Sequence, residues 1–211
     1  PLIIVRDPKK TLERVCVNFF SKKPKNIIAV TGTNGKSSVA DFFHQILSYN
    51  KIPVASIGTL GVKANNKIFK SDLTSPDIIS LHQKLEKLKK LNIENVIIEA
   101  SSHGLHQGRL NGLNFKAGIF TNFSQDHLDY HSSMKSYFDS KMILFSKLLK
   151  KNMHIISDSE IYEFSKLKKV AFKNHFKILD INQKTTPLLD ANKINLIGNF
   201  QIKNLSMSIL A

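Results

Sequence analysis

The sequence predicts an α/β protein with a mostly parallel β-sheet flanked by helices. Two apolar runs, residues 96–98 and 117–121, are continuous rather than alternating, which is typical of strands covered on both faces. Residues 78–88, which precede the first of these runs, have apolar side chains at helical spacing. Strands that alternate with helices favour a parallel sheet, so polar residues that follow the strands are expected to gather at one edge.

The elements follow in order along the chain. Residues 2–5 predict a short strand, and Asp7 before Pro8 predicts the N-cap of a helix that ends near residue 20. The polar segment 21–26 predicts a linker, so the main domain is expected to start near Lys25. After it we expect strands at 27–30, 52–57, 96–98, 117–121 and 153–157, helices at 37–47, 76–91, 133–149 and 202–211, and a hairpin at 62–70. Residues 160–193 give no clear pattern.

Size and composition narrow the class of protein. With 211 residues, 42% of them hydrophobic, the chain can bury one core, or one domain plus a fragment of another. We expect no membrane span and no secretory leader, because the sequence has neither a run of about 20 apolar residues nor a charged-then-apolar start. Cys16 is the only cysteine, which suits a cytoplasmic protein. Because the first residue is Pro1, we expect the chain to begin inside a longer protein.

The formal net charge of +15 raises the alternative of a nucleic-acid-binding module. Such modules tend to concentrate arginine and aromatic residues on one surface. Here lysines are scattered along the chain, and Arg6, Arg14 and Arg109 are the only arginines. Dispersed lysines indicate a solvated surface whose positive field suits an anionic substrate, so we expect no nucleic-acid partner.

The segment around Gly32 and Gly35 predicts a phosphate-binding loop. It follows the strand at 27–30 and opens a helix, which is the context such a loop needs. Glycines let backbone N–H groups point at phosphate oxygens, Lys36 can reach the outer phosphates, and the Ser37 hydroxyl can bind Mg²⁺. The strict pattern fails at Val30, where a glycine would stand. A plain glycine turn with a solvated lysine is the alternative, but the context favours nucleoside triphosphate binding.

Other polar residues at strand ends suggest further chemistry. Glu99 follows a buried strand and is a reasonable Mg²⁺ ligand, whereas taken alone it would more often be a capping or solvated carboxylate. His127 alone would more often be structural. The sequence contains neither a zinc-type spacing of histidines and cysteines nor a G-x-S-x-G motif, so we expect no transition-metal site and no serine hydrolase. Arg109 could hold a carboxylate or phosphate through two hydrogen bonds.

Four ordered blocks resemble the Mur ligase family, and the resemblance covers about residues 27–211. They are T-G-T-N-G-K-S-S at 31–38, E-A-S-S-H-G-L-H-Q-G-R at 99–109, F-T-N-F-S-Q-D-H-L-D-Y-H at 120–131 and G-N-F-Q-I-K-N at 198–204. The first shares the family's departure at Val30, and the second and third are most like the member that adds the third amino acid of the peptide. The resemblance implies a P-loop NTPase-like central ATPase domain at 25–211, preceded at 1–24 by a remnant of the N-terminal domain and linker, with no C-terminal domain.

The resemblance also implies an activity. Such a ligase activates the D-glutamyl carboxylate of UDP-MurNAc-L-Ala-D-Glu with ATP as an acyl phosphate, which the amine of a diamino acid then attacks in peptidoglycan precursor synthesis. The implied partners are small molecules only, the cofactors are ATP and Mg²⁺, and we expect a monomer. Folylpolyglutamate synthetase, which shares the loop and general fold, is the nearest alternative, followed by a truncated ATP-binding remnant without turnover. The sequence leaves open whether meso-diaminopimelate or L-lysine is added.

The resemblance assigns roles to individual residues. Lys36, His127 and Lys141 are expected to be catalytic, with Lys141 carrying a carbamate. ATP would be held by Gly32, Thr33, Asn34, Gly35, Lys36, Ser37, Ser38 and Asn204, and Mg²⁺ by Ser37, Glu99, His127 and carbamylated Lys141. The UDP-sugar-peptide would contact Thr74, Ser75, Ser101, Gln107 and Arg109. Two departures stand out: the family's Asn-Thr-Thr is Leu73-Thr74-Ser75 here, and the first Asn of its late motif is Gln201.

Overall fold

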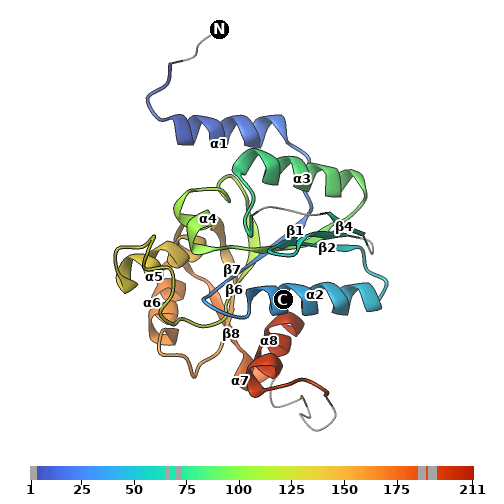
Figure 1. Cartoon of the computed structure of the whole chain (residues 1–211), viewed down its shortest axis with the longest axis vertical. Helices are drawn as coiled ribbons and strands as arrows, with labels where there is room; N and C mark the ends of the chain where they lie inside the picture. The colour runs from blue at the N-terminus through green and yellow to red at the C-terminus, as the bar shows by residue number, and fades with distance from the viewer. Residues whose placement is uncertain (1–3, 65–66, 70–72, 185–188, 190–193) are drawn as a thin grey trace.

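The computed structural model describes residues 4–64, 67–69, 73–184, 189 and 194–211. Within them an eight-stranded sheet has the order β4-β3-β2-β5-β1-β6-β7-β8 (Figure 1). The pairs β2–β3 and β3–β4 are antiparallel, and all the other neighbouring strands are parallel. The predicted α/β class with a mostly parallel sheet is therefore confirmed.

The strands are β1 (Asn26–Thr31), β2 (Val54–Gly58), β3 (Gly61–Ala64), β4 (Lys67–Phe69), β5 (Asn95–Glu99), β6 (Phe115–Phe120), β7 (Leu149–Ser157) and β8 (Lys177–Asp180). The helices are α1 (Pro8–Phe19), α2 (Lys36–Tyr49), α3 (Ile78–Lys90), α4 (Ser102–His106), α5 (Met134–Ile143), the π-helix η1 (Leu144–Leu148), α6 (Phe164–Asn174), α7 (Ile181–Lys184) and α8 (Asn199–Ile209). No helix of the described residues is long and apolar enough to cross a bilayer.

Helices cover both faces of the sheet, and each face has its own apolar core (Figure 1). The first core joins the sheet to α3, α5 and α6, through side chains such as Leu85, Phe138 and Leu167. The second joins it to α2, α7 and α8, through side chains such as Phe43, Ile181 and Met207. Central strands such as β5 are therefore buried on both sides, as their continuous apolar runs predict.

The register of the three central strands brings their carboxyl ends level. Val30 of β1 lies opposite Glu99 of β5, and Thr31 lies opposite Phe120 of β6. The loop after β1, the Glu99 side chain and the segment after β6 therefore meet at one edge of the sheet, where ligands bind in parallel α/β sheets.

Asp7 caps α1 as predicted, because its side chain accepts a hydrogen bond from Lys10 N at 3.0 Å. The α1 helix lies on the outside of the molecule against α3 (Figure 1). The predicted strand at 2–5 is wrong at Ile4 and Val5, which lack regular structure, and its other residues lie outside the described part of the chain. The predicted hairpin is present as β3 and β4, whereas its turn at 65–66 lies outside the described residues.

The predicted helix at 133–149 is wrong at its C-terminal end. The α-helix ends at Ile143, the next turn is a π-helix, and Leu149 already belongs to β7. The wider turn lets Leu144 and Phe145 both bury fully in the first core. The sequence alone does not indicate this change from an α-helix to a π-helix, because the residues at 144–148 suit an α-helix equally well. Residues 160–193, which had no predicted elements, contain α6, β8 and α7.

Candidate active site

The loop after β1 has the geometry of a phosphate cradle. Gly35 is the N-cap of α2 with a φ of 86°, and it offers no side-chain acceptor to the first amides of the helix. A Cβ atom at Gly35 would lie 2.6 Å from Asn204 Oδ1, so glycine suits both the backbone angle and the close approach of α8. Helix N-termini with available amides favour anions such as phosphate.

Two lysine ammonium groups converge on one carbonyl of this loop. Lys36 Nζ donates to Gly32 O at 3.0 Å and to Thr33 O at 2.7 Å, and Lys141 Nζ donates to Gly32 O at 2.7 Å. Burial lowers the pKa of Lys36. Burial and the positive charge of Lys36 lower the pKa of Lys141 from 10.5 to about 7. Lys36, together with Lys141 when it is protonated, favours a polyanionic ligand at this place.

Glu99 forms the second polar group of the site. Its Oε2 accepts hydrogen bonds from Ser37 Oγ at 2.8 Å and Thr59 Oγ1 at 3.2 Å, and its Oε1 accepts one from Thr59 N at 3.1 Å. A Cβ at Gly58 would lie 1.9 Å from Glu99 Oε1, so this strand end leaves room for the carboxylate. A hydroxyl and a carboxylate side by side are hard oxygen donors, which fit Mg²⁺. Thr59 was not predicted, because threonine after a strand carries no functional signal.

His127 lines the site and has a left-handed backbone conformation, with a φ of 52°. Its Nε2 is 3.5 Å from Asp126 Oδ2, and its ring packs edge-on against His103 with centroids 4.9 Å apart. Among the described residues, no three His, Cys, Asp or Glu side chains are grouped so as to hold a metal ion. A divalent ion here would therefore depend on hydroxyl, phosphate or carbamate oxygens in addition to Glu99.

A cavity of about 280 Å³ joins these groups. It brings together all three predicted catalytic residues, Lys36, His127 and Lys141. Its remaining lining residues are Thr33, Asn34, Gly35, Ser37, Ser38, Thr59, Thr74, Glu99, Ser101 and Ser102. The cavity thus combines the predicted phosphate, magnesium and catalytic groups with two of the predicted substrate residues, Thr74 and Ser101.

The other predicted substrate residues, Ser75, Gln107 and Arg109, do not line this cavity but are joined by hydrogen bonds to each other and to the loop of Ser101. Ser75 is fully buried, donates to Glu99 O at 2.8 Å and accepts from Ser101 N at 3.1 Å. Arg109 donates to Gln107 Oε1 at 2.8 Å and to Ser75 O at 2.9 Å. These contacts order the loop of Ser101, which also caps α4 by accepting from Gly104 N. Direct substrate contacts of Ser75, Gln107 and Arg109 stay predictions.

A second cavity, of about 440 Å³, lies on the other side of the loop. It contains Asn204, predicted to lie near the adenine, whose Nδ2 donates to Gln201 Oε1 at 3.0 Å. Gln201, the departure from the family motif, therefore orients Asn204. The cavity is lined by Asn34, Gly35, Thr121, Asn122, Asp158, Ile161, Phe200, Lys203, Asn204 and Met207. Asp158 and Lys203 were not predicted, because they come from elements 45 positions apart in the sequence.

Comparison with known sequences extends the resemblance. The UDP-N-acetylmuramoyl-L-alanyl-D-glutamate--2,6-diaminopimelate ligase of Brucella melitensis is 44% identical over 151 residues, which are 72% of this chain and 31% of that protein. The ligase of the same name from Rickettsia bellii is 39% identical over 230 positions, covering 97% of this chain and 48% of that protein. The chain thus spans less than half the length of these relatives.

Comparison with solved structures supports the same fold. A UDP-N-acetylmuramoyl-L-alanyl-D-glutamate--2,6-diaminopimelate ligase superposes with a TM-score of 0.79 at 27% identity, over 96% of this chain and 46% of that one. Folylpolyglutamate synthase of L. casei, at 12% identity, shares the fold with a TM-score of 0.73 over 100% of this chain and 63% of that one. Residues 30–211 match the Mur ligase middle domain. The chain therefore belongs to the Mur ligase family, whose members are ATP-dependent amide-bond-forming ligases.

Proposed function

We propose that this chain forms the ATP-binding part of a ligase that joins 2,6-diaminopimelate to UDP-MurNAc-L-Ala-D-Glu in the cytoplasm. The observation that carries the proposal is the convergence of Lys36 and Lys141 on Gly32 O, next to the contact between Ser37 and Glu99. The names of the relatives support diaminopimelate as the amino acid.

The residues of the first cavity suit transfer of a phosphoryl group to a carboxylate. Backbone amides at the start of α2 would hold the phosphates, and Lys36 would stabilise the negative charge that develops as the group moves to the D-glutamyl carboxylate. The acyl phosphate that results is open to attack by an amine, which forms the amide and releases phosphate. Lys141 would bring a second positive charge to the same place or, once carbamylated, an anion.

A magnesium ion fits Ser37 and Glu99, because their oxygens are 2.8 Å apart and face the same cavity. When bound, such an ion neutralises charge on the phosphates. His127 also lines the cavity and would contribute only together with further oxygen donors.

The test is a ligation assay with two pairs of substrates. A full-length ligase that contains this domain should release phosphate with ATP, UDP-MurNAc-L-Ala-D-Glu and 2,6-diaminopimelate, and should be much slower with L-lysine. A folate with L-glutamate, the substrates of the alternative ligase, should give no phosphate. We expect the 211-residue chain by itself to bind ATP·Mg²⁺ weakly without forming the product, because closure over the nucleotide needs residues beyond it. Phosphate release with the folate pair alone would contradict the proposal.

A further inference from the structure

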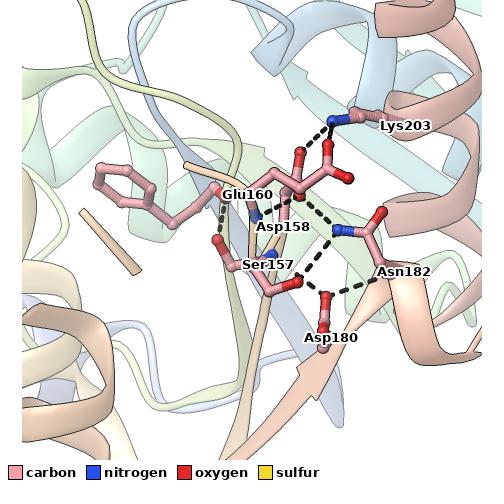
Figure 2. Close-up of polar contacts among 8 residues, drawn as sticks. Ser157, Asp158, Glu160, Asp180, Asn182 and Lys203 are labelled. Atoms are coloured by element: carbon pink, nitrogen blue, oxygen red, sulfur yellow. Dashed lines mark hydrogen bonds and ion pairs between the residues drawn. The ribbon is translucent and has the colours of Figure 1, made fainter. Parts of the chain in front are cut away.

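A lysine on α8 is held by two carboxylates that follow β7. Lys203 Nζ lies 2.7 Å from Asp158 Oδ2 and 2.6 Å from Glu160 Oε2 (Figure 2). The Asp158 side chain is only 4% exposed, whereas that of Glu160 is 68% exposed. An exposed ion pair contributes little, so the buried pair with Asp158 is the one that matters.

Asp158 is itself fixed to the sheet on its other side. Its Oδ1 accepts hydrogen bonds from Glu160 N at 2.8 Å and from Asn182 Nδ2 at 2.6 Å, next to the end of β8 (Figure 2). Asp180, the last residue of β8, accepts from Ser159 N and Asn182 N, both at 3.1 Å. The carboxylate is therefore a rigid anchor built from the ends of two neighbouring strands, and α8 is tied to it through Lys203.

The same turn of α8 forms a wall of the second cavity. Lys203 precedes Asn204, and both line that cavity with Asn34 and Gly35 of the phosphate loop. Farther along α8, Ser208 Oγ donates to Val39 O of α2 at 3.0 Å, so the helix has a second attachment to the loop's own helix. The pair of Lys203 and Asp158 lies one residue before Asn204 along α8, and the Asn204 side chain lies close to Gly35.

We propose that Lys203 is a positioning residue for the nucleoside: its ion pair with Asp158 holds Asn204 beside the phosphate loop, so that the second cavity fits a nucleoside. The inference rests on the proposed nucleoside triphosphate site and assigns its specificity for the nucleoside, as opposed to the phosphates, to this pair. Lys203 acts through Asn204 and the cavity wall, at a distance from the transferred phosphoryl group.

The experiment compares two ligands that share phosphates but differ in the nucleoside. Binding of ATP·Mg²⁺ and of inorganic triphosphate with Mg²⁺ to the 211-residue chain is measured by calorimetry. Lys203→Met should raise the Kd for ATP about tenfold and change that for triphosphate by less than about twofold. Lys203→Arg should bind ATP like the unmodified chain, because a guanidinium can still pair with Asp158. Lys63→Met removes the more exposed ion pair with Asp41, which does not line the second cavity, and should change neither affinity.

A second variant covers the case in which Lys203→Met does not fold because Asp158 is left buried without its cation. Asp158→Asn keeps an oxygen for Glu160 N and Asn182 but removes the charge. The double variant Asp158→Asn with Lys203→Met should fold, and its affinity for ATP should be no weaker than that of either single variant, since both remove one interaction.

The outcomes separate this inference from the proposed function. Equal loss of affinity for ATP and triphosphate would overturn the role of Lys203 but not the proposed phosphate site. Unchanged ATP affinity in Lys203→Met, or in the double variant if Lys203→Met does not fold, would do the same. A loss of ATP affinity in Lys203→Arg as large as that in Lys203→Met would also overturn the role of Lys203. If the unmodified chain binds neither ligand, the proposed nucleotide site itself is wrong and this inference falls with it.

Discussion

The Ser37 hydroxyl donates a hydrogen bond of 2.8 Å to Glu99 Oε2, although the two residues are 62 positions apart. The parallel pairing of β1 with β5 produces this contact, because Val30 lies opposite Glu99 and the phosphate loop begins at the next residues. A hydroxyl on the phosphate loop and a carboxylate on the next strand are thereby fixed at the spacing that one small cation can bridge.

Glu99→Gln should raise the Mg²⁺ concentration needed for ATP binding about tenfold, because a neutral amide replaces the anionic ligand. ATP binding to the chain would be titrated with Mg²⁺ at constant ionic strength. Glu163→Gln is the control, since Glu163 precedes α6 and does not line the cavity. An unchanged Mg²⁺ dependence in Glu99→Gln would show that the ion binds elsewhere.

Gly58→Ala should also raise the Mg²⁺ concentration needed for ATP binding, although this substitution replaces no polar group. The new Cβ would lie 1.9 Å from Glu99 Oε1, so the carboxylate must shift, which disturbs its hydrogen bond with Ser37. Overpacking of this kind costs about 1–3 kcal/mol of folding free energy, which thermal unfolding would show. Ser56→Ala on the same strand is the matched control. Normal Mg²⁺ dependence in a folded Gly58→Ala variant would mean that the position of Glu99 does not govern metal binding.

Lys141 should make the stability of the chain depend on pH. In the unfolded chain its pKa is near 10.5, whereas in the folded chain it is about 7, so between these values the unfolded state binds more protons. The free energy of unfolding should therefore rise as the pH increases from 7 to 10, by at most about 1.4 kcal/mol per pH unit. Lys141→Met should accordingly stabilise the chain most below pH 7 and hardly at all above pH 10.

Denaturant unfolding at several pH values, in buffer free of bicarbonate, checks this expectation. The difference between the unmodified chain and Lys141→Met is the relevant quantity, because groups that do not interact with Lys141 titrate equally in both. The charge of Lys141 also acts on His103 and His131, so the change in this difference between pH 7 and pH 10 is decisive. A difference that stays constant with pH would show that Lys141 remains a normal ammonium in the folded chain.

A lowered pKa also makes Lys141 a candidate for carbamylation, since CO₂ adds to the neutral amine. A carbamate there would give the cavity an anionic oxygen ligand facing His127. We expect Lys141→Ala to nearly abolish ligation by a full-length ligase that contains this domain, and added short carboxylates to restore part of it. Lys141→Glu should retain more activity than Lys141→Arg. The reverse order would mean that the residue works as a cation.

Local patterns were sufficient to predict the glycine loop between β1 and α2, the alternating strands and helices, and the cap at Asp7, because each depends on a few consecutive residues. The sequence could not indicate the π-helix after Ile143, which depends on packing against β6 and β7. Helix α4 is only five residues long and contains Gly104, so it has no periodic signal. The helices and strand between residues 160 and 193 give no clear periodic pattern, because this segment is rich in lysines, whose long side chains can reach water from a helix or a strand.

The candidate site divides in the same way. Glu99 and His127 follow predicted strands, so their meeting at one edge could be foreseen from the fold class. Thr59 and the pair of Asp158 and Lys203 could not, because their importance arises from contacts between distant elements. For Ser75, the resemblance predicts a contact with the substrate. In the structure its buried hydroxyl instead contacts Glu99 O and Ser101 Oγ.

The central claim is that the loop after β1 binds the phosphates of ATP through Lys36. Calorimetry with ATP·Mg²⁺ on the 211-residue chain tests it most directly, with Lys36→Ala compared with Lys22→Ala. Lys36 is half-buried and lines the cavity, whereas Lys22 is exposed in the segment before β1. Lys36→Ala should abolish measurable binding, and Lys22→Ala should leave it unchanged within about twofold. Equal effects of the two substitutions, or normal binding in Lys36→Ala, would contradict the assignment of this loop.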